Sequence, residues 1–364
     1  MKVLHISPTY FSDQSFIGGG ERFAYELAKA MAKKEEVAFL TFGDEMSSHR
    51  DEALMVQHLR RTTFLRRCFR NPLSLPFVKW VYWADVIHCH QVHTLGTDMA
   101  ILLGKLFRKK VFITDHGGGE RYALAYHLPI LKWVNTFLFQ SEYCRELWVQ
   151  APLKSRPESF KVVYGGVDPQ KFSPGPGKKS KTVLFVGRLL PHKGIDCLID
   201  AIEGKLSLNV VGRVYHKAYF ELLKAKSKDK DVRFHTTADD GDVVQKYRES
   251  LVTVLPSVYE NCYGNRTVVP ELLGLVALES MACGTPVIVT EVASLPEIVE
   301  DGVTGFLVPP NNPDAIREKI EFFHANPDVA LEMGKRGREQ VLKRFTWDAV
   351  ATRCLEAYDL SKRQ

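Results

Sequence analysis

The sequence predicts an α/β protein built from two doubly wound domains, and three observations support this prediction. The chain has 364 residues, which exceeds the size at which a single hydrophobic core usually stops growing. Short β-branched and aromatic runs alternate with segments of helical period, as in repeated βα units with parallel sheets. Each half opens with a buried strand, a glycine-bearing loop and a helix, at Val3–Met31 and at Val183–Ile202. We expect two Rossmann-like domains whose strand carboxyl ends face a common cleft, because open α/β sheets bind ligands there.

Twelve short runs have the composition of buried strands, six in each half. In the first half they are Lys2–Ile6, Val37–Thr41, Val86–His88, Val111–Thr114, Phe137–Gln140 and Lys161–Tyr164. In the second half they are Thr182–Gly187, Leu208–Gly212, Val232–His235, Val252–Leu255, Val287–Thr290 and Gly305–Val308. The segment Asp168–Ser180 holds three prolines, two glycines and little that could pack, which is typical of a linker.

These elements predict the domain organisation. We expect a first domain over residues 1–168, a linker over 169–180 and a second domain over 181–345. The remaining residues, 346–364, begin with an N-cap residue, Thr346, and continue with apolar residues at helical spacing. They predict a terminal helix that needs a surface to pack against.

The composition is that of a soluble globular protein, with 45% hydrophobic, 25% charged and 11% aromatic residues. No apolar run approaches the roughly 18 residues that cross a bilayer. Met1–Tyr10 is interpreted as a first strand and not as a signal peptide, because His5, Ser7 and Pro8 interrupt its apolar stretch. The seven cysteines are odd in number, widely spread and without a Cys-x-x-Cys pair. This pattern indicates neither a disulfide framework nor a zinc site, and it favours a cytoplasmic location.

The net charge of +6 lies in the first half of the chain, where the segment Arg60–Lys110 has ten basic and two acidic residues. It contains Arg60, Arg61, Arg66, Arg67, Arg70 and Lys79, interleaved with Phe64, Leu65, Phe69, Phe77, Trp80 and Trp83. Such a segment suits peripheral contact with an anionic membrane, for example the inner face of the cell membrane. A solvated basic helix followed by a buried one explains it equally well, because Pro72 and Pro76 break any single amphipathic helix. Nucleic acid is not expected as a partner, since no recognition motif accompanies the charge.

The stretch ELLGLVALESMACGTP, Glu271–Pro286, is the most informative part of the sequence. Gly274 is predicted to open a helix and Gly284 to close it. The free N–H groups at the helix start form an anion site. Two carboxylates, Glu271 and Glu279, flank this turn and can accept hydrogen bonds from hydroxyls. The arrangement suits a ligand with phosphate in its middle and polyols on both sides, although an isolated pair of glutamates would be read as surface charge.

Basic and glycine-rich loops follow other predicted strands. In GRLLPHKG, Gly187 lets the backbone approach a ligand, while Arg188 and Lys193 place two cations beyond the sheet edge that could hold a diphosphate. A solvated basic loop is the simpler explanation for two cations alone. In the first half, glycine runs occur at residues 18–20 and 117–119, and His116 directly follows a strand. Taken alone, these features are more often turns and a packed histidine.

Together these motifs resemble a family 4 glycosyltransferase, also described as glycosyl transferases group 1. The resemblance is carried in the family's order by GGGERFAYELAKAM, FQSEYCREL, YGGVDPQKFSP, VLFVGRLLPHKGIDCLIDAI, ELLGLVALESMACGTPVIVT and LPEIVEDGVTGFLVPPNNPDAI. It implies the two-domain GT-B fold, with the terminal helix crossing back to the first domain. It also implies a retaining mechanism, no required metal or other cofactor, and a nucleotide-diphosphate sugar as donor, with either UDP or GDP.

The resemblance also assigns roles to residues. Glu271 and Glu279 match the Glu-x7-Glu pair, of which the first contacts sugar hydroxyls and the second the ribose. Arg188 and Lys193 match the cations on the donor diphosphate, and His116 resembles the histidine near the transferred sugar. The catalytic set is therefore Glu271, Arg188, Lys193 and His116. The donor-binding set is Gly19, Gly20, Gly187, Gly212, Gly274, Leu275, Val276 and Glu279.

The sequence departs from the family pattern in two places. Residues Asn261–Pro270 are inserted before the Glu271 motif, which makes Glu260 a rival for the role of the first glutamate, although its spacing to Gly274 is wrong. Where the family often has two glycines, this chain has Ala293-Ser294. The sequence Asp240-Gly241-Asp242 resembles a metal motif, but we interpret it as the capped start of a surface helix.

The resulting function is transfer of a hexosyl or N-acetylhexosaminyl group to a hydroxyl of a glycan, a lipid-linked acceptor or a small molecule, as in polysaccharide biosynthesis. Two alternatives remain at this point. A nucleotide-sugar 2-epimerase shares the fold and also holds a diphosphate. A catalytically silent subunit would bind the nucleotide-sugar without turning it over.

Overall fold

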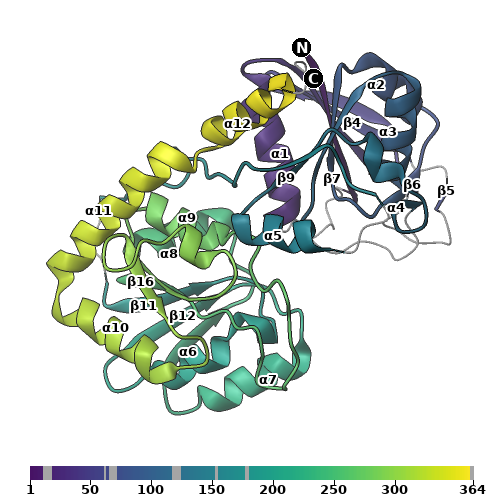
Figure 1. Ribbon diagram of the computed structural model, residues 1–364. Helices are drawn as coiled ribbons and strands as arrows, with labels where there is room; N and C mark the ends of the chain where they lie inside the picture. The colour runs from purple at the N-terminus through teal and green to yellow at the C-terminus, as the bar shows by residue number, and fades with distance from the viewer. Residues whose placement is uncertain are drawn as a thin grey trace. The chain divides into compact units, whose positions relative to one another are not determined.

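The computed structural model describes residues 1–10, 19–60, 63–64, 72–116, 124–151, 155–176 and 180–360 (Figure 1). The chain divides into two compact units. Unit 1 combines Met1–Gly166 with Trp347–Gln364, and unit 2 is Val167–Thr346. Each unit has its own sheet and its own hydrophobic core.

Unit 1 contains an eight-stranded sheet in the order β10-β9-β8-β7-β1-β2-β4-β3. Its strands are β1 (Lys2–Tyr10), β2 (Glu36–Gly43), β3 (Ser47–Asp51), β4 (Leu54–Arg60), β7 (Val86–His90), β8 (Lys110–Thr114), β9 (Thr136–Phe139) and β10 (Ser159–Val162). All neighbours pair in parallel except β3, which runs antiparallel to β4 at the edge. A short separate pair joins β5 (Thr63–Phe64) and β6 (Pro72–Leu73). The chain adds β2 on one side of β1 and later adds β7 on the other side. The boundary of β1 and β7 is therefore the topological switch point of this sheet.

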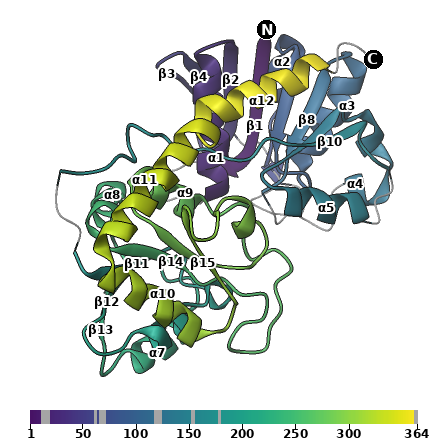
Figure 2. The same cartoon turned by 60° about the vertical axis from the view of Figure 1, so that its left-hand side comes forward.

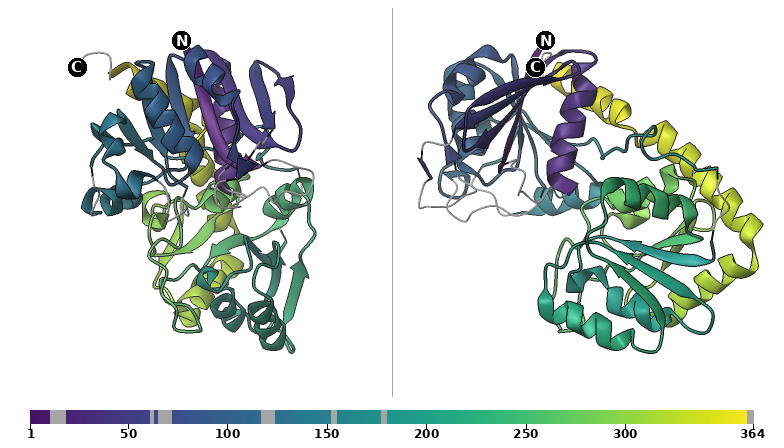
Figure 3. Two further views of the ribbon diagram at one scale, coloured as in Figure 1. Left: turned by 90° about the vertical axis from the view of Figure 1, so that its right-hand side faces the viewer. Right: turned by 180° about the vertical axis from the view of Figure 1, so that it is seen from behind.

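Helices α1 (Gly19–Ala32) and α12 (Trp347–Leu360) lie side by side in unit 1, as Figures 2 and 3 show. Their apolar faces, which include Phe23, Leu27, Val350 and Tyr358, form one core with strand residues such as Val86. The other helical segments of the unit are α2 (Phe77–Trp83), α3 (Leu95–Leu106), α4 (Leu124–His127), η2 (Ile130–Trp133) and α5 (Glu142–Gln150). The terminal helix thus belongs to unit 1, although it is separated in sequence from the rest of that unit by all of unit 2.

Unit 2 contains a six-stranded parallel sheet in the order β13-β12-β11-β14-β15-β16. Its strands are β11 (Thr182–Val186), β12 (Ser207–Val211), β13 (Asp231–His235), β14 (Val252–Leu255), β15 (Val287–Thr290) and β16 (Gly305–Val308). Its helical segments are η3 (Pro191–Lys193), α6 (Ile195–Ala201), α7 (Lys217–Lys226), α8 (Asp240–Glu249), α9 (Leu275–Ala282), η4 (Leu295–Glu297), α10 (Pro313–Ala325) and α11 (Pro327–Arg344). The order is that of a doubly wound nucleotide-binding sheet, with its switch point between β11 and β14.

The structure confirms the predicted fold class, and each of the twelve predicted strands overlaps a strand of the two sheets. The sequence analysis missed β3 and β4. It was also wrong to find little that could pack in Asp168–Ser180, because Phe172 is buried and its ring contacts that of Tyr247. Arg248 donates a hydrogen bond to the carbonyl of Ser173 over 2.7 Å, so the segment is fixed to unit 2 at Phe172 and Ser173.

Candidate functional site

The loops after β11 and β12 meet next to the switch point of unit 2. Gly187 and Gly212 follow the two strands with φ of 156° and 150°. A Cβ atom on Gly212 would lie 1.7 Å from the carbonyl oxygen of Gly187. A side chain at this position would therefore collide with the neighbouring backbone, so glycine is required to bring the two strand ends this close.

The same region brings together Lys193 and Glu271, which lie 78 positions apart in sequence. The Lys193 Nζ is 2.5 Å from Oε1 of Glu271, and both side chains are 13% exposed. The Ser257 hydroxyl donates to the same Glu271 oxygen over 2.7 Å, and Lys193 also donates to the carbonyl of Pro270 over 3.1 Å. Among the described residues, Oε2 of Glu271 has no hydrogen-bond partner. This oxygen can therefore accept a hydrogen bond from a ligand hydroxyl.

Arg188 and His192 complete the charged part of the site. Arg188 is exposed, and its guanidinium lies 5.8 Å from the centre of the Tyr215 ring. Burial, together with the positive charges of Lys193 and Arg188, lowers the pKa of His192 to about 4, although Glu271 acts in the opposite direction. His192 is therefore neutral near pH 7 and adds no charge to the two cations. The sequence analysis did not single out His192, although it lies inside the GRLLPHKG motif.

The start of α9 provides backbone amides. Gly274 is the N-cap with φ of 90°, and a Cβ atom there would lie 2.6 Å from Cδ2 of Leu295. Leu275 and Val276 occupy the first two helical positions, and the first N–H groups bonded back to Gly274 are those of Ala277 and Leu278. The amides of the first helical turn are the ones that a helix leaves available for an anion.

Glu279 lies on α9 and is held from the neighbouring helix α8. The hydroxyl of the buried Tyr247 donates to Oε2 of Glu279 over 2.9 Å. The Glu279 side chain is partly exposed. A fixed and accessible carboxylate is suited to accept hydrogen bonds from a diol such as a ribose.

The inserted segment Asn261–Pro270 forms a turn beside this site. A bridge between Glu260 and Arg266 closes the turn, and the Tyr263 ring stacks on that of His216 with 5.8 Å between centres. Glu260 is exposed, and the carboxylate that binds Lys193 is that of Glu271. The structure thus favours Glu271 over its rival.

The two departures and the rejected metal motif have local structural explanations. Ala293 has φ of 50°, and its N–H donates to the Tyr259 hydroxyl over 2.8 Å. Asp239 is the N-cap of α8, where it forms a capping box with Asp242. Asp240 pairs with Lys171 at 2.7 Å. These aspartates therefore act in helix capping and surface pairing, as the sequence analysis expected.

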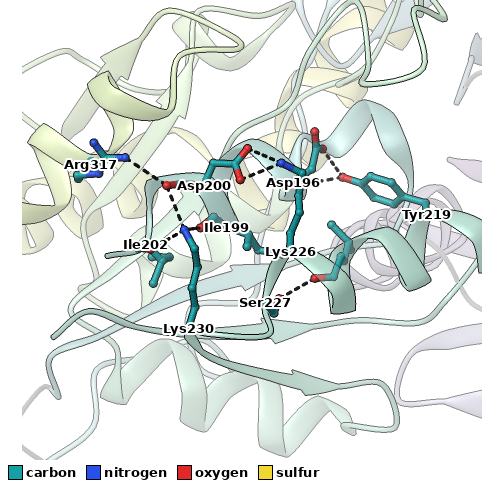
Figure 4. A network of polar contacts seen from close by, with 10 residues as sticks. Asp196, Ile199, Asp200, Ile202, Tyr219, Lys226, Ser227, Lys230 and Arg317 are labelled. Atoms are coloured by element: carbon teal, nitrogen blue, oxygen red, sulfur yellow. Dashed lines mark hydrogen bonds and ion pairs between the residues drawn. The ribbon is translucent and has the colours of Figure 1, made fainter. Parts of the chain in front are cut away.

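Helix α6, which directly follows Lys193 and Gly194, is anchored at its C-terminal end (Figure 4). The ammonium of Lys230 donates to the carbonyls of Ile199 and Ile202, at 2.9 Å each. Arg317 donates to the carbonyls of Asp200 and Ala201. Two cations at this helix end thus donate to its last carbonyls, of which that of Ile199 also accepts from the N–H of Ile202, and they oppose its negative dipole end.

In unit 1 the structure brings Gly20 and His116 together. Gly19 and Gly20 are the first residues of α1 and not part of a loop as expected. A Cβ atom on Gly20 would lie 3.1 Å from the Cβ of His116. Residues 117–120 of the second glycine run lie outside the described residues.

A row of histidines at the switch point of unit 1 was also missed. His5, His88 and His90 are buried side by side, and their rings lie within stacking distance of one another. His116 extends the row, with its ring centre 5.5 Å from that of His90. The sequence signal for this row was the alternation of polar residues near strand ends, as at His88 and His90.

Comparison with known proteins identifies the class. Residues 17–171 match the family model described as Glycosyltransferase Family 4, and residues 167–340 match that described as Glycosyl transferases group 1. An uncharacterised glycosyltransferase of Methanocaldococcus jannaschii is 30% identical over 296 residues, which are 76% of this chain and 75% of that protein. The D-inositol 3-phosphate glycosyltransferase of Streptomyces bingchenggensis is 30% identical over 229 residues, which are 56% of this chain and 48% of that protein.

Solved structures show the same fold over the whole chain. Sucrose-phosphate synthase from Thermosynechococcus elongatus superposes with a TM-score of 0.74 at 21% identity, covering 99% of this chain and 98% of that one. HepE of Anabaena, in complex with UDP-glucose, gives a TM-score of 0.72 at 20% identity and covers 99% of both chains.

The fold and the family matches together define a glycosyltransferase with the GT-B fold. The chain belongs to the group 1, or family 4, glycosyltransferases.

Proposed function

We propose that the chain transfers a sugar from a nucleotide-diphosphate donor to a hydroxyl acceptor with retention of anomeric configuration. The observation that carries the proposal is the cluster at the unit 2 switch point. A Lys193–Glu271 pair, the exposed Arg188 and the amide-rich start of α9 at Gly274 lie on loops that follow β11 and β14. This set can bind a diphosphate and a polyol at the same time.

In the proposed mechanism the protein stabilises charge on the leaving group. Negative charge grows on the diphosphate as the sugar–phosphate bond breaks, and Arg188, Lys193 and the amides of Leu275 and Val276 would oppose it. We propose that Glu271 binds sugar hydroxyls, Glu279 binds the ribose, and His116 contacts the transferred sugar. Because fixed cations already face the diphosphate, we also propose that no metal is required.

The donor is proposed to be a UDP- or GDP-sugar. HepE in complex with UDP-glucose makes UDP-glucose the first donor to test. A thermal-shift panel of nucleotide-diphosphate sugars would identify the ligand, since a ligand at a hundred times its Kd adds about 2.7 kcal/mol to the free energy of unfolding. Conversion of the donor to an epimer without acceptor would support the 2-epimerase instead. Binding without any turnover would support the silent subunit.

Arg188→Ala gives the sharpest test of the diphosphate role, because this side chain is exposed and its loss leaves the core intact. We expect turnover to fall by on the order of a hundredfold, as for removal of one preorganised charge-stabilising group. Arg233→Ala, at an arginine with 66% side-chain exposure on β13, is the matched control and should keep normal turnover. Equal turnover in the two variants would show that Arg188 does not take part in the mechanism.

A chelator should leave turnover unchanged if no metal is required. Loss of activity in the presence of a chelator, followed by recovery when manganese is added, would contradict metal independence.

We further propose that unit 1 contacts an anionic membrane that carries a lipid-linked acceptor. The enzyme would then be cytoplasmic and bound peripherally to the inner face of the cell membrane. Large apolar side chains are exposed here, with Leu75 80%, Tyr82 67% and Leu106 69% accessible. Tyr82 contacts both Phe107 and Lys109, so α2 and the end of α3 form one surface. Exposed apolar groups next to lysines suit an anionic lipid interface.

The structure divides the basic aromatic segment identified in the sequence. Phe77 is buried, and Trp80 and Trp83 are partly buried against each other. Arg61, Arg66, Arg67 and Arg70 lie outside the described residues. No helix in the described ranges is long and apolar enough to cross a membrane.

Liposome sedimentation tests the membrane proposal. Binding should rise with anionic lipid, fall with salt, and weaken when the exposed Lys79, Lys105 and Arg108 become glutamate. The same change at Lys205, Lys217 and Lys228 of unit 2 is the control. Full recovery of the wild-type protein in the supernatant at low salt would favour a soluble glycan or small-molecule acceptor.

A further inference from the structure

The polar residues at the unit 1 switch point form a hydrogen-bonded row across four neighbouring strands. His5 lies on β1 and His90 on β7, while His116 lies two residues after the end of β8 and Gln140 directly follows β9. His5 Nδ1 is 2.9 Å from His90 Nε2, and His90 Nδ1 is 3.3 Å from His116 Nε2. At one end, His5 Nε2 is 3.4 Å from Sδ of Met31 on α1. At the other end, the Gln140 amide nitrogen contacts His116 Nδ1.

Every imidazole in this row is neutral near pH 7. Burial lowers the pKa of His5 and of His116 to about 3, and it lowers the pKa of His90 well below its ordinary value. A neutral imidazole has one nitrogen that donates and one that accepts. The state of one ring therefore determines the state of the next ring along the row.

The two ends of the row give it a direction. A thioether sulfur can accept a hydrogen bond but cannot donate one, so His5 carries its proton on Nε2. His5 Nδ1 then accepts from Nε2–H of His90, and His90 Nδ1 accepts from Nε2–H of His116. His116 Nδ1 is left as an acceptor, and it faces the amide nitrogen of Gln140, which donates. Both ends thus require the same tautomer in all three rings.

A metal site is the alternative use of these side chains, because nitrogen atoms of His5, His88 and His90 lie within 4.8 Å of one another. Each of these nitrogens already has a partner, however. His88 Nδ1 is 2.7 Å from the Tyr358 hydroxyl, and its Nε2 is 2.8 Å from Oγ1 of Thr114. A divalent ion would have to break such bonds and would add two positive charges to a core of neutral ligands, which is costly without a compensating anion.

We propose that Met31, His5 and His90 are positioning residues, which hold His116 as the neutral Nε2–H tautomer with Nδ1 as its acceptor. This inference rests on the proposed contact of His116 with the transferred sugar. A sugar hydroxyl would donate to Nδ1 in place of the Gln140 amide. A carboxylate oxygen cannot donate and would face a lone pair, so the row favours a neutral sugar over a uronic acid at this position.

Nitrogen-15 NMR of the full chain tests the tautomers without any reference to activity. We expect protonated Nε2 and unprotonated Nδ1 in His5, His90 and His116 at pH 7. In Met31→Leu, which keeps the volume and removes the acceptor, the signals should shift toward a mixture of tautomers. Protonated Nδ1 in the wild-type rings would contradict the proposed tautomers. A shift of the His5, His88 and His90 signals on addition of one equivalent of zinc would contradict the proposal in favour of a metal site.

Kinetics with the best donor from the panel test the positioning role. We expect His90→Phe to lower kcat/KM about tenfold, and His90→Gln to restore it to within about twofold, because a glutamine can donate on one side and accept on the other. If His90→Phe folds poorly, Met31→Leu provides the same comparison with an isosteric change. Wild-type kinetics in folded variants whose tautomers are disturbed would refute the positioning role. Absence of glycosyl transfer with every donor, in a wild-type protein with the expected tautomers, would instead refute the proposed function.

Discussion

At the residue scale, the candidate site depends on backbone positions as much as on charged groups. Lys193 and Glu271 meet because the loops after β11 and β14 approach each other, and the carbonyl of Glu271 is held by the Ser294 hydroxyl at 3.3 Å. Ser294 follows Ala293, whose φ of 50° is uncommon for a residue with a Cβ atom. Ala293 thus holds a left-handed backbone conformation that a glycine would adopt without strain.

Replacement of Ala293 by glycine should therefore stabilise unit 2. Relief of the left-handed strain is worth about 1–3 kcal/mol, and the greater entropy of glycine in the unfolded chain offsets about 0.5–1 kcal/mol. We expect a net gain of about 1 kcal/mol in the free energy of unfolding, measured by urea denaturation. Ala315→Gly in helix α10 is the matched control and should cost about 1 kcal/mol. A loss of stability in Ala293→Gly would show that the turn is not strained.

At the element scale, the sequence predicted the strands well because buried parallel strands are continuous apolar runs such as Val287–Thr290. It missed β3, since Ser47–Asp51 is a polar edge strand without β-branched residues. It missed the packing of Phe172, because proline and glycine dominate the composition around it. The histidine row was beyond reach for another reason. Each histidine is visible in the sequence, but their contacts depend on which strands become neighbours.

The Glu271–Glu279 motif and the basic loop were predictable because each is local in sequence. The ion pair between Lys193 and Glu271 could not be predicted without the fold. The preference for Glu271 over Glu260 also depended on the fold, because the insertion Asn261–Pro270 obscures the spacing of the motif. Helix α6 shows how a local element depends on distant residues. Its final carbonyls are satisfied by Lys230 and by Arg317, which come from separate parts of unit 2.

Loss of the Lys230 ammonium should therefore weaken unit 2. In Lys230→Met the aliphatic stem remains, but two 2.9 Å hydrogen bonds to Ile199 and Ile202 disappear. We expect the free energy of unfolding to fall by about 1–2 kcal/mol, from lost charged hydrogen bonds and weaker compensation of the helix dipole, which Arg317 then opposes alone. Lys228→Met, at an exposed neighbour, is the control and should stay within about 0.5 kcal/mol. Equal stabilities of the two variants, measured by urea denaturation, would contradict this anchoring role.

At the scale of the whole molecule, unit 1 is a single core assembled from both ends of the sequence. Val350, Ala351, Cys354 and Tyr358 of α12 are fully buried against α1 and the sheet. The hydroxyl of Tyr358 also binds His88, so the terminal helix covers the histidine row. The described part of unit 1 thus holds five imidazoles whose pKa burial lowers strongly, those of His5, His88, His90, His93 and His116, together with the buried carboxyl group of Asp98.

These groups predict how the stability of unit 1 depends on pH. Burial lowers the pKa of His5 and His116 to about 3 and that of His93 to about 4. It lowers the pKa of His88 and His90 well below 6.5, the value expected in the unfolded chain. Below pH 6.5 the unfolded state therefore binds protons that the native state does not. The stabilisation is present above pH 6.5 and is lost as the pH falls, by about 1.4 kcal/mol per pH unit for each histidine.

Asp98 acts in the opposite direction. Burial raises its pKa from 3.8 to about 6, so between these values the native state binds a proton that the unfolded state does not. Falling pH thus stabilises the native state through this group and offsets about one of the five histidines. We expect the free energy of unfolding of unit 1 to be about 5 kcal/mol lower at pH 5 than at pH 6. Hydrogen exchange of β1 and β7 measures this change within unit 1. Asp98→Asn removes the offset and should increase the loss to about 6 kcal/mol. A pH-independent exchange free energy would mean that the histidines are charged or exposed in the native protein.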